Sequence, residues 1–438
     1  MSATLIGILG IVLLLVLLFL GMNIGFSMIV VGFLGYLVLV NSKAAMGLFA
    51  SVPFTTVANY GLSVIPMFVL MGQFAFYAGI SQDLYSACNK SLGRVPGSLA
   101  SATIVACAFF AAICGSSTAT TATMGVVCLP EMRKYKYQDQ LSTGVIAAGG
   151  TLGILIPPST GFILYAIAAE ESIGTMFAAG ILPGILLALM YIMTILIEVK
   201  LNPVLAPKNT EKYSGKEKAI AVVKALPIII IFVIVLGGIF GGWFSANAGA
   251  AIGAFLAFIF MLCKKKATWT NIKKSCFDTI RTSCMIFLIM IGAYVFGYFL
   301  TASRLPIDLA NAIAAAHMPK IVVVLLILAI YAVLGCFIDS LPLIVLLTPI
   351  FLPIVNNMGM DPVWFGVLMV MIMQLGLITP PVGMCVYVMG GIAKDVPLFK
   401  IFKGVVPFII ALVITVIIIA LIPQIAQFLP NLWYGYLG

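Results

Sequence analysis

The first notable feature of this sequence is how little charge it carries. Asp, Glu, Lys and Arg make up 8% of the 438 residues, against about a quarter in a soluble domain. The longest polar stretch, residues 200–224, lies between long apolar segments. No soluble domain is visible, so a soluble enzyme or a soluble binding module is excluded.

Side chains typical of catalytic and metal sites are also scarce. The one histidine, His317, has no cluster of partner ligands, whereas a metal site needs several. The nine cysteines are scattered through apolar segments without a CxxC pair, which indicates packing rather than disulfides or metal. No HExxH motif, Ser/His pair or carboxylate cluster is present, which argues against a membrane-embedded enzyme.

Apolar segments dominate what is present. Hydrophobic residues make up 63% of the chain, and residues 5–20, 226–262 and 405–422 are the plainest candidates for crossing about 30 Å of hydrocarbon. Lipid offers no partner for backbone polar groups, so these segments must be helices, and they lack the alternation of barrel strands. The sequence therefore predicts an all-α polytopic membrane protein. Its net charge of +10 comes from short loops, where basic residues set orientation, and does not indicate nucleic-acid binding.

The chain contains two copies of one unit. Residues 152–158 (LGILIPP) match residues 375–381 (LGLITPP) at an offset of 223, and the same offset pairs Ser117 with Ser340. Fixed spacing over this distance indicates duplication. We therefore divide the chain into a first repeat, a linker and a second repeat, at residues 1–199, 200–224 and 225–438.

Basic residues indicate that the two copies are inverted, because Lys and Arg mark the cytoplasmic side of short loops. Among the first 89 residues only Lys43 is basic, whereas the matching part of the second copy carries Lys264, Lys265, Lys266, Lys273, Lys274 and Arg281. In the next segment the first copy carries more basic residues than the second. Residues 95–130 are flanked by Lys90, Arg94, Arg133, Lys134 and Lys136, but residues 321–353 by Lys320, Asn356, Asn357 and Asp361. Equivalent loops thus carry opposite charge, as an inverted repeat predicts.

Five crossings per copy account for the inversion, since an odd number places the second copy on the opposite face. In the first copy they are predicted at residues 5–20, 24–41, 62–80, 142–169 and 174–198. Residues 95–130 have basic residues at both ends, so they form a re-entrant helical hairpin that enters from the cytoplasm. Residues 321–353 form its twin, which enters from outside. Residues 43–60 and 266–282 are predicted as helices lying in the interface, the alternative being solvated loops.

A polar turn interrupts each hairpin midway. The turns are residues 114–118 (CGSST) and 335–340 (GCFIDS), in which glycine permits the bend and Ser or Asp caps the next helix. Half-helices that meet at a turn leave N–H and C=O groups unpaired, which is tolerated at membrane depth only where they are buried in protein or line a cavity. The alternative is that Ser and Thr beside Gly only pack helices closely.

A Pro-Pro pair breaks one span in each copy. Pro157 and Pro158 in the first copy, and Pro380 and Pro381 in the second, each remove an N–H donor and together end the helix. Proline can simply kink a span, but interrupted helices at matched positions of two copies are the best sequence indicator of a transporter's binding site. Their free carbonyls suit a hard cation such as sodium, and their helix N-termini suit a carboxylate.

Inversion brings the two polar turns and the two Pro-Pro breaks toward one point near the midplane of the membrane. We expect the substrate carboxylate to bind there, near Ser116, Ser117, Thr118, Pro158, Ser159, Asp339 and Pro381. We expect one sodium ion per repeat, the first at Ser116, Ser117 and Gly153, and the second at Gly335, Asp339, Ser340, Gly376 and Thr379. Asp339 stands out, since an ionisable group within a span is costly. Arg304 either faces the cavity and meets the anion, or extends from a helix end to the interface.

These motifs resemble those of the large membrane subunit of tripartite ATP-independent periplasmic (TRAP) transporters. The resemblance is carried by residues 115–118 (GSST), 152–159 and 374–383 (QLGLITPPVG), together with the segments 335–339 and 349–353. It covers essentially the whole chain, and the Pro-Pro motifs are quite specific in combination.

The resemblance implies an elevator-type secondary transporter without a prosthetic group, which imports an organic acid with sodium across a bacterial inner membrane. It implies scaffold helices at residues 1–60 and 225–282, and transport elements at residues 62–198 and 283–425. It also implies two protein partners, a periplasmic substrate-binding (P) protein and a small membrane (Q) subunit, in a setting of membrane lipid. The first 40 residues already match residues 226–262, so the small subunit is expected to be a separate chain. Sialic acids and C4-dicarboxylates are the commonest substrates of the family, and we lean slightly to sialic acid.

Two other transport classes share some of these features. A stand-alone sodium- or proton-coupled dicarboxylate permease also has broken helices and re-entrant hairpins, and a requirement for a binding protein separates the two. An ion channel is disfavoured, because the sequence has no repeated ring of pore-lining charges.

The charge asymmetry predicts that the N-terminus lies outside the cell and residues 200–224 in the cytoplasm. In a chain without its nine native cysteines, single cysteines at Ser2 and Lys212 should react with an impermeant maleimide from opposite faces of the membrane. Labelling of Ser2→Cys only from the cytoplasm, and of Lys212→Cys only from the periplasm, would contradict this topology.

Overall fold

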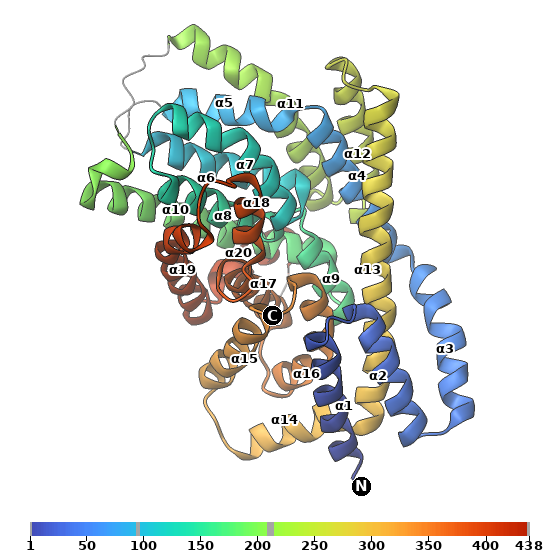
Figure 1. The fold of residues 1–438 in the computed structure, drawn as a ribbon. Helices are drawn as coiled ribbons and strands as arrows, with labels where there is room; N and C mark the ends of the chain where they lie inside the picture. Colours follow the sequence, from blue (N-terminus) through green and yellow to red (C-terminus); the bar gives the residue numbers. More distant parts are fainter. Residues whose placement is uncertain (1, 93–96, 208–213, 436–438) are drawn as a thin grey trace.

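The computed structural model describes residues 2–92, 97–207 and 214–435, and every regular element in these residues is a helix (Figure 1). Arg94, the first residues of the predicted 95–130 hairpin and Lys212 in the linker lie outside the described residues. Within the described residues, six helices are long and apolar enough to cross a membrane, or seven if the bent helix at residues 215–240 is counted. The prediction of an all-α polytopic membrane protein is confirmed.

The first repeat supplies ten α-helices. They are α1 (Ala3–Phe19), α2 (Ile24–Leu39), α3 (Ser42–Val57), α4 (Val64–Tyr77), α5 (Ile80–Leu92), α6 (Ser98–Cys114), α7 (Ser117–Lys134), α8 (Asp139–Thr151), α9 (Thr160–Ala169) and α10 (Ile173–Leu201). Single 3-10 turns follow α3, α8 and α10, at Tyr60–Ser63, Leu152–Ile154 and Pro203–Leu205. We call α6 and α7 hairpin 1.

In the second repeat, several helices begin at or near the predicted offset from their counterparts. Its helices are α11 (Gly215–Phe240), α12 (Ala246–Cys263), α13 (Trp269–Ser303), α14 (Leu305–Ala315), α15 (Lys320–Gly335), α16 (Ser340–Asn357), α17 (Pro362–Ile378), α18 (Met384–Ile392), α19 (Leu398–Leu421) and α20 (Gln424–Tyr434). The starts of α7 and α16, and those of α8 and α17, are each 223 residues apart. We call α15 and α16 hairpin 2.

The second interface helix, predicted at residues 266–282, differs from the prediction. Residues from Trp269 onward begin α13, which continues through the predicted scaffold boundary at residues 282/283 to Ser303. The physical reason is local. In the first repeat Asn59 Oδ1 accepts the N–H of Gly61 at 2.8 Å, and this turn separates α3 from α4. The equivalent residues of the second repeat contain no Gly, Asn or Pro, so the helix runs on.

Helices of the two repeats pack reciprocally. α2 packs along α13, and its twin α12 packs along α4, which is the twin of the later part of α13. Likewise α7 contacts α8 and α18, whereas α16 contacts α17 and α9. Tyr165 on α9 donates to the carbonyl of Pro362 at 2.6 Å, which ties the first repeat's break to α17. Each hairpin therefore lies against the broken helices of both repeats.

Two short helices that the sequence analysis did not separate lie across opposite ends of the bundle. α5 lies at the end that also carries the connection from α12 to α13, and α14 lies at the end with the N-terminus (Figure 1). Lys264 in that connection pairs with Asp83 of α5. At the other end Thr4 donates to Asp308 of α14 at 2.6 Å.

Close backbone contact joins α8 to α19. A Cβ added at Gly404 would lie 2.1 Å from the carbonyl oxygen of Gln140, and one added at Gly144 would lie 2.3 Å from the carbonyl oxygen of Gly404. Both distances are well inside van der Waals contact, so only glycine permits this packing.

We predict that Gly404→Ala destabilises the protein by about 1–3 kcal/mol, the usual cost of forcing an extra methyl into a packed interior. Gly297→Ala is the matched control, because a Cβ there would meet nothing within 4 Å. Thermal unfolding in detergent should show a lower transition temperature for the first variant alone. Equal transition temperatures for the two variants would contradict the close contact.

Candidate functional site

The tip of hairpin 1 is built as a capped turn. Gly115 ends α6 with φ +61°, a left-handed conformation that favours glycine. Ser116 caps α7: its Oγ accepts the N–H of Ala119 at 3.4 Å and lies 3.3 Å from Oγ1 of Thr118. The tip is held against the broken helix, because Thr160 donates to the carbonyl of Gly115 at 2.6 Å and Ser117 to that of Thr151 at 3.2 Å.

The tip of hairpin 2 is its counterpart with a charged cap. Asp339 occupies the position equivalent to Ser116, and its Oδ1 accepts the N–H of Ser340 at 2.7 Å. Asp339 is half-buried, and α16 begins beside it. Both predicted caps are thus in place, at N-termini whose partial positive charge favours anions.

The two predicted Pro-Pro breaks are present, each with a cis Pro-Pro peptide bond. In the first repeat, α8 ends in a 3-10 turn and the helix resumes after Ser159, which is fully buried and caps α9. Ser159 Oγ donates to the carbonyl of Ile154 and accepts the N–H of Phe162 at 3.3 Å. In the second repeat, Thr379 is extended and α18 follows Gly383 without a side-chain cap.

Each break touches the tip of its own repeat. A Cβ added at Gly153 would lie 2.5 Å from the carbonyl oxygen of Ser116, and one at Gly376 would lie 2.1 Å from that of Gly335. The structure therefore places Gly153 against Ser116 and Ser117, and Gly376 against Gly335. In the second predicted sodium group, the Oγ1 atom of Thr379 is buried and has no hydrogen-bond partner among the described residues.

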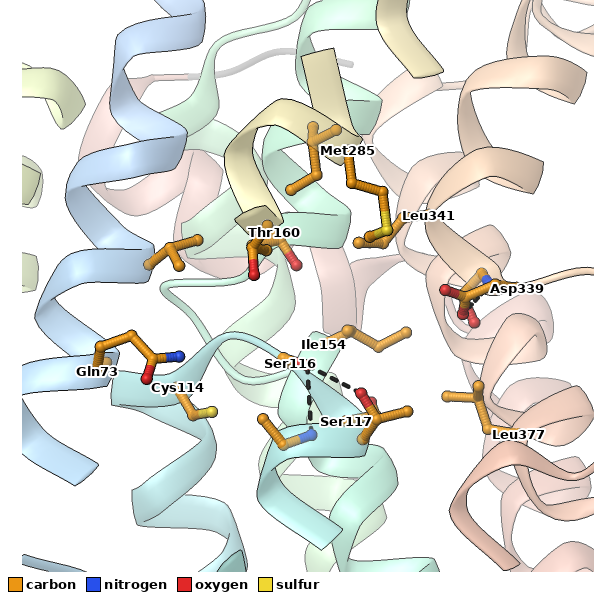
Figure 2. Close-up of a pocket in the computed structure, with 17 residues that line it drawn as sticks. Gln73, Cys114, Ser116, Ser117, Ile154, Thr160, Met285, Asp339, Leu341 and Leu377 are labelled. Carbon is orange, nitrogen blue, oxygen red and sulfur yellow. Dashed lines mark hydrogen bonds between the residues drawn. The ribbon is translucent and has the colours of Figure 1, made fainter. Parts of the chain in front are cut away.

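A cavity of about 240 Å³ lies between the two tips (Figure 2). Of the predicted residues, the cavity is lined by Ser116, Ser117, Thr118, Asp339 and Ser340. It is not lined by Gly153, Pro158, Ser159, Arg304, Gly335, Gly376, Thr379 or Pro381. Most of these lie in the breaks and turns behind the tips, where they shape the backbone that the tips contact.

Arg304 is the exception, since it lies far from the cavity. It follows the last residue of α13 with φ +60°. Met285 of the same helix lines the cavity, and at 1.5 Å per residue the two lie about 28 Å apart. Of the two interpretations of Arg304, the structure therefore favours the one in which it lies at a helix end.

Two helices contribute lining residues that the sequence analysis missed. They are Val69, Gly72 and Gln73 on α4, and Thr282, Met285 and Ile286 on α13. Gln73 reaches the cavity from the side opposite Asp339 (Figure 2). Its amide is the one strongly polar side chain in the apolar run of α4, a signal that could have identified it. Cys114, Ala119, Ile154, Thr160, Leu341 and Leu377 complete the lining.

The lining of this cavity contains a single charged side chain. Asp339 is the one carboxylate among the lining residues, and none of them is Lys, Arg or His. Hydroxyl groups come from Ser116, Ser117 and Thr118. The arrangement offers hard oxygen ligands for a cation and helix N-termini for an anion, side by side.

The chain is similar to known transport proteins. Residues 11–425 match the family described as "Tripartite ATP-independent periplasmic transporter, DctM component". The chain is 33% identical over 423 residues to the sialic acid TRAP transporter large permease protein SiaM of Vibrio cholerae, covering 96% of this chain and 97% of that protein. It is also 33% identical over 383 residues to the C4-dicarboxylate TRAP transporter large permease protein DctM of Pseudomonas aeruginosa, covering 87% and 88%.

A solved structure has the same fold. The YdaH transporter of Alcanivorax borkumensis matches with a TM-score of 0.62 over 91% of this chain and 90% of that one, at 15% sequence identity.

We predict that Gly376→Ala abolishes transport while Gly161→Ala preserves it. The added Cβ of Gly376→Ala would displace the backbone of hairpin 2. The Cβ of Gly161→Ala would meet its nearest neighbours at 3.5 Å, which is an ordinary contact. Uptake by membrane vesicles with matched protein levels is the measurement. Normal uptake by Gly376→Ala would show that the tip does not need this close approach.

Proposed function

The chain belongs to the DctM-component family of tripartite ATP-independent periplasmic transporters. From that premise we propose that it is the large membrane subunit of a system that imports an organic acid together with sodium. The system would carry the acid across a bacterial inner membrane. Large permeases of this family are transport components rather than enzymes. They work with a small membrane subunit and a periplasmic binding protein. For this chain, the small subunit is a separate partner and the binding protein delivers the acid.

The charge of the cavity is the observation that supports sodium coupling. Asp339 is negative, the substrate brings a carboxylate, and no basic side chain lines the space between them. At an effective dielectric constant of about 20, two like charges about 4 Å apart repel by about 4 kcal/mol. Cations bound beside Asp339 remove this repulsion, so the acid enters favourably only when they are present.

Sodium suits the groups available. Ser116, Ser117 and Gly153 form the first proposed site, where the carbonyl of Ser116 faces the glycine. Gly335, Asp339, Ser340, Gly376 and Thr379 form the second, which includes the unpartnered hydroxyl of Thr379. Hydroxyl, carbonyl and carboxylate oxygens are ligands for a hard cation, and unwound helices supply them in transporters.

The lining also favours an acid with one carboxylate. The N-termini of α7 and α16 meet at the cavity and favour one anionic group. A second carboxylate would need a further positive charge that the lining does not supply. Gln73 and the tip hydroxyls instead suit hydroxyl or amide groups. This supports the sialic acid class over the C4-dicarboxylates.

An elevator motion fits the division of the lining. Hairpin 1 is tied to the broken helices of both repeats, because Arg133 contacts Asp139 at the start of α8 at 2.7 Å and Asp395, just after α18, at 2.8 Å. Hydrogen bonding from Arg133 lowers the pKa of the Asp395 carboxyl, so this tie is ionised at neutral pH. The sequence analysis assigned α4 and the later part of α13 to the transport elements. Since α13 is continuous and α4 packs along α12, we instead place both with the scaffold, past which the tips move.

Reconstitution distinguishes this function from its rivals. Proteoliposomes should hold the chain, its small subunit and candidate binding proteins, with and without a sodium gradient. Saturable uptake that requires both sodium and the binding protein supports the proposal. Uptake without any binding protein indicates a stand-alone permease, and conductance indicates a channel.

We predict that Asp339→Asn abolishes sodium-driven uptake of the acid. Asparagine still caps α16, so the fold is kept while the charge is lost. Arg304→Ala is the control, because its position at the far end of α13 leaves the cavity unchanged. Normal uptake by a well-expressed Asp339→Asn variant, or equal losses in both variants, would argue against this role for Asp339.

A further inference from the structure

A second cavity lies outside the transport site, in a groove between α5 and α7. Its volume is about 410 Å³. One face of each helix lines it, namely Gln82, Tyr85, Ser86, Asn89 and Lys90 on α5, and Val126, Val127, Pro130, Glu131, Lys134 and Tyr135 on α7. None of these residues lines the cavity between the hairpin tips.

The groove changes from apolar to charged along its length. Val126 and Val127 lie toward the tip of hairpin 1, whereas Glu131 and Lys134 lie at the end of α7. At 1.5 Å per residue this gradient extends over about 12 Å. Val126 is 63% exposed, so the apolar end opens to the surface of the protein. A phospholipid has the same gradient, from acyl chain to headgroup.

Two buried polar side chains of the groove, Tyr85 and Asn89, each have an atom without a partner among the described residues. Asn89 is 7% exposed and Tyr85 is 3% exposed, yet Asn89 Oδ1 and the Tyr85 hydroxyl have no hydrogen-bond partner among the described residues. The carboxylate of Glu131 makes no hydrogen bond or ion pair with another residue that the structure describes. Buried polar groups without partners are costly, and a ligand in the groove would pair with them.

The duplication supplies an internal comparison. At the offset of 223, Asn89, Lys90 and Glu131 correspond to Ala312, Ile313 and Ile354. At the opposite end of the molecule, Leu309 and Ile313, the equivalents of Ser86 and Lys90, line an apolar groove that α14 forms chiefly with α15. The hairpin fold therefore does not require polar residues at these positions, which indicates that those of the first repeat have another role.

The groove lies at the level of the lipid headgroups. α5 lies across the end of the bundle that carries the connection from α12 to α13, with its lysines 264–266 (Figure 1). Such basic loops mark the cytoplasmic interface.

We propose that this groove binds a phospholipid whose headgroup carries both a phosphate and a primary ammonium. The phosphate lies between Lys90 and Lys134, the ammonium donates to Glu131, and an acyl chain follows Val126 and Val127. The ammonium also donates to Asn89 Oδ1, and the Tyr85 hydroxyl donates to a phosphate oxygen. An anionic lipid without an amine would leave Glu131 facing like charge, and a choline lipid could not donate to it.

Native mass spectrometry of the purified protein, with its small subunit where the two co-purify, tests this binding. Phosphatidylethanolamine, phosphatidylcholine and phosphatidylglycerol with identical acyl chains are the probes. We expect phosphatidylethanolamine to bind most tightly. Glu131→Gln should weaken its binding about tenfold and abolish the preference over choline, because a charge-assisted hydrogen bond is lost. Lys134→Gln should weaken all three lipids.

Lys136→Gln is the matched control, since it removes a charge two residues from Lys134 but does not line the groove. It should leave lipid binding unchanged. Three results would overturn the proposal: equal binding by Glu131→Gln and the native protein, tightest binding of phosphatidylglycerol, or exclusion of lipid from the groove by the small subunit. Thermal unfolding of each variant in lipid-free detergent separates loss of binding from loss of fold.

Discussion

Backbone hydrogen bonding inside the lipid bilayer is the constraint on which this structure depends. A helix that stops halfway across a membrane exposes N–H and C=O groups to a solvent that cannot pair with them. The structure interrupts its helices at four places and pairs much of the freed backbone locally, through Ser116, Ser159 and Asp339 as caps. Gly153 and Gly376 then let each break approach a tip without a side chain between them. The two tips line a single cavity, so the interruptions of the helices meet at one candidate binding site.

Much of this arrangement could be predicted from the sequence, because its determinants are local. Gly115 permits the turn, Pro157 and Pro158 end a helix, and Ser or Asp caps the next one wherever the chain folds. The duplication then matched the interruptions of one copy to those of the other. The offset of 223 residues that pairs Ser117 with Ser340 in the sequence is also the offset between the starts of α7 and α16.

The rest depends on packing between distant segments. Nothing near Thr282 or Met285 indicates a cavity, because which face of α13 meets the tips is decided by its contacts with α2 and α16. The continuity of α13 was also missed, since the first repeat has a turn at Asn59 that the second lacks. Arg304 was a candidate because it is a charged residue near a predicted span. It lies at the end of α13, and the length of that helix keeps it away from the cavity.

The single carboxylate at the tips has an electrical consequence. Repeat symmetry would place identical caps on both hairpins, yet one is Ser116 and the other is Asp339, so the unloaded cavity carries one negative charge. With two sodium ions and a monocarboxylate bound, as proposed above, the charges cancel. The loaded tips then cross the membrane as a neutral body, and the empty tips return with one negative charge. A cell interior held at −100 mV favours that outward return by up to about 2.3 kcal/mol, so membrane potential resets the carrier rather than loading it.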